Sequence, residues 1–282
     1  MKAIVTITAY DRLDLLSSLI SCLDKNERDL FDVVIFPDRV DAETYDSIKR
    51  IASGSSLNVF VKPVPRVQLG CDLNIIKSVA EADTVGSGYT HIIKVDSDLL
   101  VSNHFVHDLL VLSEKFDAYA ATPITGRHSL ETKLEHVNSW IPGSATGSNK
   151  CIPIHQWKKI APIVTAISDR YYSQKYTMRV QRDQSVIMGV MLDVAKYYQT
   201  QLTKPVIDVM TGYGTMNVGE DGLIVTACAM YGIPCVSHSI NRAIHPSYGG
   251  VHTDIDFWRE HYNGVVIDDL PKIDPNKLKL HT

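Results

Sequence analysis

Two hydrophobic periods alternate along the first half of the chain, and this alternation limits the fold more than any other feature of the sequence. Short apolar runs at residues 3–7, 33–36, 57–61 and 91–95 have the length of buried strands. Between them, apolar residues recur at helical spacing around residues 16–23, 42–51, 73–80 and 105–116. Strands that alternate with helices build a parallel sheet, because a parallel connection needs a crossover. The sequence therefore predicts an α/β protein with helices on both faces of a mostly parallel sheet.

The alternation stops after about residue 122. Residues 123–150 predict a loop, and the stretch PGSATGSNK within them is either a mobile loop over a site or a surface linker. Helical patterns return near residues 155–167 and 184–199, and residues 219–240 predict a helix followed by one last strand. Because no clean linker interrupts the chain, we predict one domain with two lobes, residues 1–122 and residues 123–282.

Composition and charge exclude several classes of protein. The formal net charge of −4 provides no overall basic character to hold a polyanion, although a local basic patch remains open. Five cysteines without a C-x-x-C spacing favour reduced thiols over a disulfide framework or a zinc site. The N-terminal residues lack the pattern of a signal peptide, and the longest apolar stretch, residues 222–236, is too interrupted to span a bilayer. We therefore predict a cytoplasmic protein with no transmembrane segment.

Two carboxylates, Asp96 and Asp98, follow the fourth predicted strand. Ligands of open parallel sheets bind outside the carboxyl ends of the strands, and residues i and i+2 of an extended chain face the same side. Two like charges so placed repel each other unless a cation lies between them. Carboxylates suit Mn²⁺ or Mg²⁺, which in turn bind phosphate, so the pair predicts a metal–diphosphate site. The alternative is that Ser97 or Asp98 only caps the next helix.

Four motifs extend this pattern: VTITAYDR at residues 5–12, VVIFPDR at 33–39, RVQLGCDLNIIKSVAEA at 66–82 and MNVGEDGLIVTACAMYGIPC at 216–235. Together with the Asp-x-Asp pair, they resemble the motifs of GT-A glycosyltransferases, most closely those of family two. The resemblance covers about residues 1–120 and 215–250, and it implies a nucleotide-binding lobe followed by an acceptor-binding and catalytic lobe. It also implies that a set of residues binds the nucleotide: Thr8, Tyr10, Arg12, Asp38, Arg66, Gly70, Asn74 and Asp96.

The fourth motif and the residues after it supply the remaining expected site residues. The resemblance implies that Asp221 is the catalytic base with Glu220 beside it, whereas the alternative is that both only complement the dipole of a helix N-terminus. It also implies a histidine that binds the metal together with Asp96 and Asp98. His245 is the preferred candidate for that ligand and His252 the second one.

The activity implied by the resemblance is metal-dependent transfer of a sugar, from a UDP-linked or other nucleoside diphosphate donor, to an acceptor hydroxyl with inversion. The acceptor stays open. Residues 169–185 interleave tyrosines with arginines and lysines, which fits a solvated amphipathic helix, sugar stacking, or a DNA acceptor with a hydroxymethylated base as in phage enzymes. Trp140 and Trp157 are either acceptor platforms or core residues.

Three other classes share part of the pattern. A sugar-nucleotidyltransferase needs a glycine-rich first loop, which TAYDRLD lacks. A haloacid-dehalogenase-type phosphatase carries its Asp-x-Asp on the first strand. A non-catalytic protein that binds a nucleotide, a sugar or a nucleic acid would not require the pair Glu220 and Asp221.

Overall fold

The computed structural model describes residues 1–66, 69, 71–82, 86, 88–122, 136–139, 149–165, 220–238, 242–244 and 271–281. A nine-stranded sheet runs through this part of the chain in the order β11-β7-β9-β6-β8-β4-β1-β2-β3. The strands are β1 (Ala3–Ala9), β2 (Phe31–Pro37), β3 (Val59–Val61), β4 (His91–Asp96), β6 (Tyr119–Ala121), β7 (His136–Ser139), β8 (Asn149–Pro153), β9 (Cys235–His238) and β11 (Lys279–His281). Two further strands, β5 (Leu100–Val101) and β10 (Ala243–Ile244), form a separate antiparallel ribbon.

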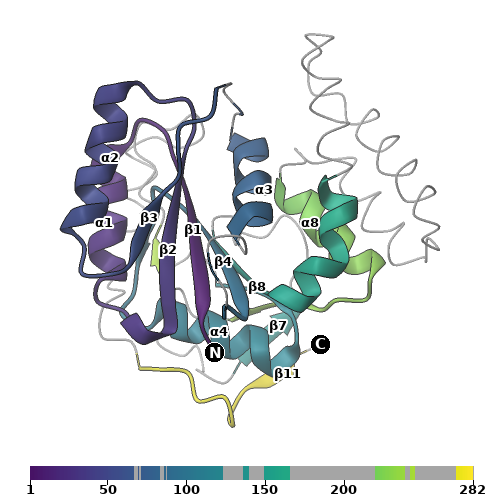
Figure 1. Ribbon diagram of the computed structural model, residues 1–282. Coiled ribbons are helices and arrows are strands. Elements are labelled where there is room, and N and C mark those ends of the chain that lie inside the picture. Colours follow the sequence, from purple (N-terminus) through teal and green to yellow (C-terminus); the bar gives the residue numbers. More distant parts are fainter. Residues whose placement is uncertain are drawn as a thin grey trace, which may run out of the picture.

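Helices cover both faces of the sheet (Figure 1). One hydrophobic cluster joins the sheet to α1 (Leu13–Leu23), α2 (Ala42–Gly54) and α4 (Phe105–Phe116). The other cluster joins the opposite face to α3 (Cys71–Ala82), α8 (Glu220–Met230) and the helix over residues 154–165. The sequence of strand β1 is almost continuously apolar because both of its faces are buried. Val5 and Ile7 pack into the first cluster, and Ile4 packs into the second.

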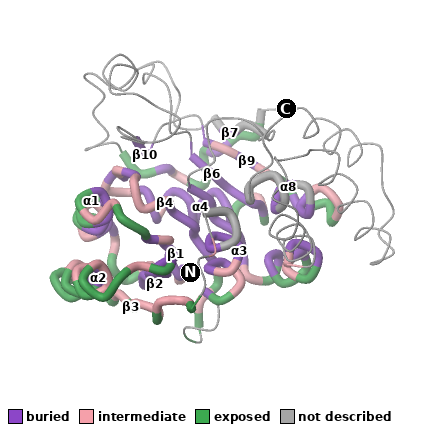
Figure 2. The backbone as a smooth tube through the Cα atoms, turned by 90° about the horizontal axis from the view of Figure 1, so that it is seen from above, coloured by how far each residue is buried: buried purple, intermediate pink, exposed green. Residues whose placement is uncertain are grey.

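Burial follows this layering. The strands in the middle of the molecule are buried, whereas α1 and α2 expose their outer sides (Figure 2). The helical spacing seen in the sequence therefore marks the side of α1 that contacts the sheet, with Leu16, Leu19 and Leu23 among its buried residues. In the described part of the chain, no helix has both the length and the apolar character needed to cross a membrane.

The α/β class and the elements expected in the first half are confirmed. Each of the four predicted strands and each of the four predicted helices there is present, with bounds that shift by a few residues. The helix near residue 155 is also confirmed, since residues 154–165 are helical. Residues 184–199, expected to be helical, lie outside the described residues.

Two expectations for the second half are wrong. Residues 123–150 were expected to form a loop, yet they include β7 and the start of β8. Strand β8 lies between β4 and β6 and is antiparallel to both. The strand after α8 is also not the last one, because β10 and β11 follow β9. The short strands β7 and β8 carry polar residues in the sequences HVNS and NKCIP, so no hydrophobic period indicates them.

The end of α8 shows the expected local chemistry. Gly232 has a φ of +65°, a left-handed conformation that glycine adopts without strain. The N–H of Ile233 donates to the carbonyl of Cys228 at 2.9 Å, which satisfies a carbonyl at the end of the helix. The glycine thus turns the chain from α8 into β9, the helix and the strand that residues 219–240 predict.

Candidate functional site

The carboxyl ends of three adjacent parallel strands, β4, β1 and β2, lie at one edge of the sheet. Asp96 is the last residue of β4, and it is paired in register with Thr8 of β1. Asp38 directly follows β2, and its N–H donates to the carbonyl of Ala9 at 2.9 Å. The structure therefore brings together three of the sequence motifs at the edge where ligands of such sheets bind.

Both acids of the Asp-x-Asp pair form ion pairs with cations of the same chain. Nη1 of Arg12 donates to Oδ2 of Asp98 at 2.6 Å, and the side chains are 34% and 15% exposed. Nζ of Lys94 lies 2.6 Å from Oδ1 of Asp96, and the side chains are 6% and 25% exposed. Each carboxylate is thus already paired with a cationic side chain, from β4 in the case of Lys94 and from the residue directly before α1 in the case of Arg12.

The backbone at Asp98 differs from the expectation. Residues 97 and 98 form a turn, with the N–H of Leu99 donating to the carbonyl of Asp96 at 3.4 Å. The alternation of an extended chain therefore does not apply to Asp98. Its direction is set by this turn and by the ion pair with Arg12.

The other expected nucleotide-binding residues have different environments. Asp38 is buried, and its Oδ1 accepts from the N–H of Leu69 at 2.8 Å, which fixes the segment before α3 against the end of β2. Asn74 is buried, and its side-chain amide donates to the carbonyl of Phe36 at 3.4 Å. These two contacts connect α3 to β2. Two residues, Tyr10 and Arg66, are exposed, and Gly70 lies outside the described residues.

A second lysine, to which no sequence motif points, lies beside Lys94. Lys150 of β8 is paired in register with Lys94 of β4, and both are buried. They border a cavity of about 10 Å³, which has room for one water molecule at most. The other lining residues come from the sheet and from the helices that cover this face of it: Ile75, Val79, Ile92, Tyr119, Ile152, Trp157 and Ile224. Lys150 belongs to a stretch that the sequence predicts to be a loop, and only the pairing of β8 with β4 reveals its position.

The segment that is expected to carry the catalytic base begins α8, and its backbone is described although the side chains of Glu220 and Asp221 are not. Ile224 lies one turn after the start of α8. Ile224 lines the same cavity as Lys94. The first turn of α8 therefore lies on the face of the sheet that carries Lys94 and Asp96.

The expected histidine ligands, His245 and His252, lie outside the described residues. The residue before His245 is nevertheless described. Ile244 of β10 is paired in register with Leu100 of β5, two residues after Asp98. The chain therefore reaches residue 245 from a point close to the Asp-x-Asp turn.

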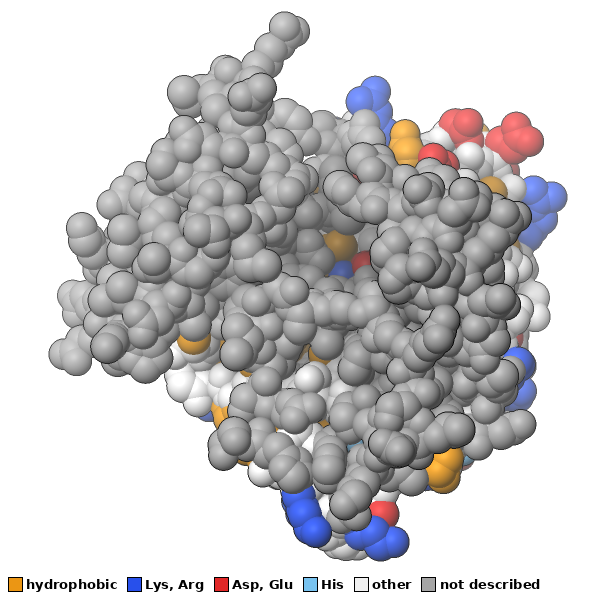
Figure 3. All heavy atoms as spheres, turned by 180° about the vertical axis from the view of Figure 1, so that it is seen from behind, with side chains coloured by type: hydrophobic (Ala, Val, Ile, Leu, Met, Phe, Trp, Pro, Cys, Tyr) orange, Lys and Arg blue, Asp and Glu red, His pale blue; other side chains and the backbone are white. Residues whose placement is uncertain are grey.

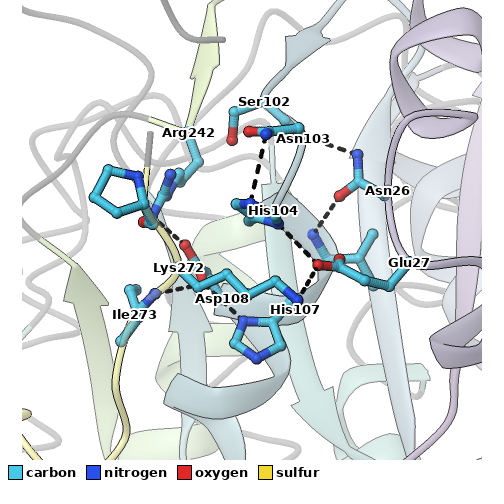
Figure 4. A network of polar contacts seen from close by, with 12 residues as sticks. Asn26, Glu27, Ser102, Asn103, His104, His107, Asp108, Arg242, Lys272 and Ile273 are labelled. Carbon is cyan, nitrogen blue, oxygen red and sulfur yellow. Dashed lines mark hydrogen bonds and ion pairs between the residues drawn. The ribbon is translucent and has the colours of Figure 1, made fainter. Parts of the chain in front are cut away.

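A buried polar network holds β10 in this place (Figure 4). Asp108 of α4 and Arg242 are both fully buried and form an ion pair. The N–H of Ile273 donates to Oδ1 of Asp108 at 3.1 Å, and Nη2 of Arg242 donates to the carbonyl of Pro271 at 2.6 Å. The carbonyl of Arg242 accepts from the N–H of Ser102 at 2.8 Å. The pair thus joins α4, the start of β10 and the segment that leads to β11.

The chemistry of Asp96 and Asp98 fits a divalent cation. Their carboxylate oxygens are hard ligands, and Mg²⁺ and Mn²⁺ often bind through one or two carboxylates plus substrate phosphates. Within the described ranges, no group of three or more potential ligand side chains occurs. The two aspartates would therefore share the cation with phosphate oxygens or with a residue outside those ranges. Seen from behind, hydrophobic, basic and acidic side chains of described residues lie close to one another near the centre of Figure 3.

The acceptor candidates give one correction. Trp157 is buried in the core cluster with Ile160 and Ile163, so it cannot be an acceptor platform. Trp140 and residues 169–185 lie outside the described residues.

No protein-family model and no curated protein matches this sequence. Among solved structures, the chain is similar to S. aureus TarS, with 15% identity and a TM-score of 0.42 over 57% of this chain and 30% of that one. It is similar to S. aureus TarS 1–349 in complex with UDP, with 11% identity and a TM-score of 0.46 over 82% and 71% of the two chains. It is also similar to the mannosyltransferase PcManGT from Pyrobaculum calidifontis in complex with GDP-Man and Mn²⁺, with 14% identity and a TM-score of 0.46 over 82% and 74%. The chain thus spans less than a third of the TarS chain.

Proposed function

We propose that this protein is a glycosyltransferase that moves a sugar from a nucleoside diphosphate sugar to an acceptor hydroxyl. One observation carries the proposal: the Asp96–Asp98 turn, the end of β1 with Arg12, and Asp38 after β2 meet at one edge of three adjacent parallel strands. Acids for a cation, a guanidinium for phosphate and an acid for a ribose are the groups that such a donor requires.

The cation belongs to Asp96 and Asp98 in this proposal, with His245 as the third ligand. When bound, a divalent ion offsets the negative charge that gathers on the diphosphate as the sugar leaves. The register of Ile244 with Leu100 supports His245 over His252, because residue 245 directly follows Ile244 in the sequence and Ile244 lies near the Asp-x-Asp turn.

Asp221 serves as the general base. The acceptor oxygen forms a bond to the anomeric carbon, the bond between that carbon and the diphosphate oxygen breaks, and the nucleoside diphosphate keeps the electron pair. The carboxylate of Asp221 takes the hydroxyl proton, and the attack from the opposite side inverts the anomeric centre. Support comes from the backbone of α8, whose first turn lies on the same face of the sheet as Lys94 and Asp96.

A binding experiment tests the donor site first. Thermal unfolding is measured with UDP, GDP, ADP and CDP, each with and without Mn²⁺, because similar structures hold UDP or GDP-Man. We expect one nucleotide to stabilise the protein only when Mn²⁺ is present, and Asp96→Asn and Asp98→Asn to abolish that gain. Asp32→Asn is the matched control, because Asp32 lies at the opposite end of β2 and pairs with Lys2. The proposal would be refuted if the nucleotide stabilised the protein equally with and without Mn²⁺, and equally in the unaltered protein and in the two aspartate variants.

A turnover experiment tests the base. The protein is incubated with a panel of labelled nucleotide sugars and candidate acceptors, and released nucleotide and glycosylated product are both measured. Asp221→Asn is expected to lose transfer by at least about a hundredfold while it keeps nucleotide binding. Full turnover of that variant would show that Asp221 is not the base.

A further inference from the structure

Arg12 forms an ion pair with Asp98, whose carboxylate is a metal ligand in the proposed function. Its Nη1 lies 2.6 Å from Oδ2 of Asp98, and its side chain is about one-third exposed. The backbone of Arg12 begins α1, where its carbonyl accepts from the N–H of Leu16 at 3.0 Å, but its side chain makes no capping bond to the helix. The guanidinium therefore contacts the site rather than capping the helix, in a partly buried ion pair.

Lys94 differs from Arg12 in one respect that matters here. Its ammonium group is almost completely buried and pairs with Asp96 from within the same strand. It cannot leave Asp96 without moving a charge through the core. Arg12 comes from a different segment and is open to solvent, so its guanidinium is able to exchange one anionic partner for another.

A divalent cation at Asp98 repels the guanidinium that already neutralises this acid. The cost falls if a second anion accepts the guanidinium, and a diphosphate offers pairs of oxygens that match its planar donors. A cation on Asp98 and a diphosphate on Arg12 are therefore easier to bind together than separately.

We propose that Arg12 couples the two ligands of the site: it holds Asp98 when the site is empty and transfers to the diphosphate of a nucleotide when a divalent cation takes Asp98. This inference rests on the proposed function and deepens it, because it makes cation binding and nucleotide binding reciprocal. It also names a single residue as the cause of that reciprocity.

The test measures Mn²⁺ affinity by electron paramagnetic resonance, with and without saturating UDP or GDP. In the unaltered protein, the nucleotide is expected to strengthen Mn²⁺ binding by about tenfold or more. In Arg12→Met, Mn²⁺ alone is expected to bind several times more tightly, because its competitor is gone, while the nucleotide binds more weakly. The strengthening by nucleotide is then expected to fall by about tenfold.

Two further variants separate coupling from a merely structural role. Arg12→Lys keeps the charge and is expected to restore most of the coupling. Lys2→Met removes a comparable ion pair with Asp32, which lies at the opposite end of the same strands, and is expected to leave both affinities unchanged. A structural role for Arg12 would weaken Mn²⁺ and nucleotide together in Arg12→Met, and this result would overturn the inference.

The outcomes also distinguish the inference from the proposed function. If the unaltered protein binds neither Mn²⁺ nor either nucleotide, the proposed function itself fails. If it binds both with strong coupling and Arg12→Met is coupled to the same degree, the proposed function stands and the role of Arg12 is refuted.

Discussion

The buried pair of Asp108 and Arg242 permits a prediction whose size follows from the structure. Both side chains are fully buried, and the Asp108 carboxylate also accepts the N–H of Ile273 at 3.1 Å. Burial lowers the pKa of Arg242, while the neighbouring Asp108 acts to raise it. Arg242→Met keeps most of the volume of the side chain but removes the guanidinium, so the carboxylate keeps only the N–H of Ile273 and Nδ1 of His107, which lies 2.8 Å from its Oδ1.

Removal of one partner of a buried ion pair costs about 3–5 kcal/mol, because the remaining charge stays buried without its main counter-charge. For a chain of this length, 1 kcal/mol corresponds to roughly 2–4 °C, so Arg242→Met is expected to lower the unfolding midpoint by about 10 °C. The double variant Asp108→Leu with Arg242→Met leaves no buried charge. It is expected to cost much less than the sum of the single substitutions.

Urea unfolding and thermal unfolding of the four proteins in this cycle measure both expectations. Val106→Ala is the matched control within α4, since it truncates a buried side chain of the same helix and leaves no charge behind. The reasoning is refuted if Arg242→Met loses less than about 1 kcal/mol, or if the losses of the single variants add in the double variant.

Two further predictions concern acid sensitivity and nucleotide recognition. Burial lowers the pKa of His91 to about 4, so this histidine stays neutral in the folded protein where the unfolded chain, with a pKa near 6.5, binds a proton. The free energy of unfolding should therefore fall by up to about 3 kcal/mol as the pH drops from about 6.5 to about 4. When this free energy is measured by urea unfolding at several pH values, His91→Gln should show a smaller fall. An equal fall in the variant and the unaltered protein would contradict the prediction. Asp38→Asn keeps an oxygen that accepts the N–H of Leu69 but removes the negative charge. Calorimetry should therefore show weaker binding of UDP or GDP and unchanged binding of pyrophosphate. Equal losses of affinity for the nucleotide and for pyrophosphate would argue against a contact between Asp38 and the ribose.

Four strands and four helices of the first half, and the location of the Asp-x-Asp pair, could be predicted because they depend on local sequence. Hydrophobic period decides whether a segment is a strand or a helix, and residues next to one another stay together in any fold. The end of β4 therefore carries Asp96 wherever the strand lies, and the helix-to-strand turn at Gly232 follows from local backbone freedom.

The partners of these residues depend on segments far apart in the chain, and only the tertiary structure decides them. Arg12 meets Asp98 across 86 positions, and β8 enters the sheet beside β4 although its sequence NKCIP has no strand period. Lys150 and Arg242 have the sequence character of surface residues, yet both are buried. The physical reason is that a polar side chain can be buried only where another segment supplies compensating partners, and a sequence pattern contains no information on which segment that is.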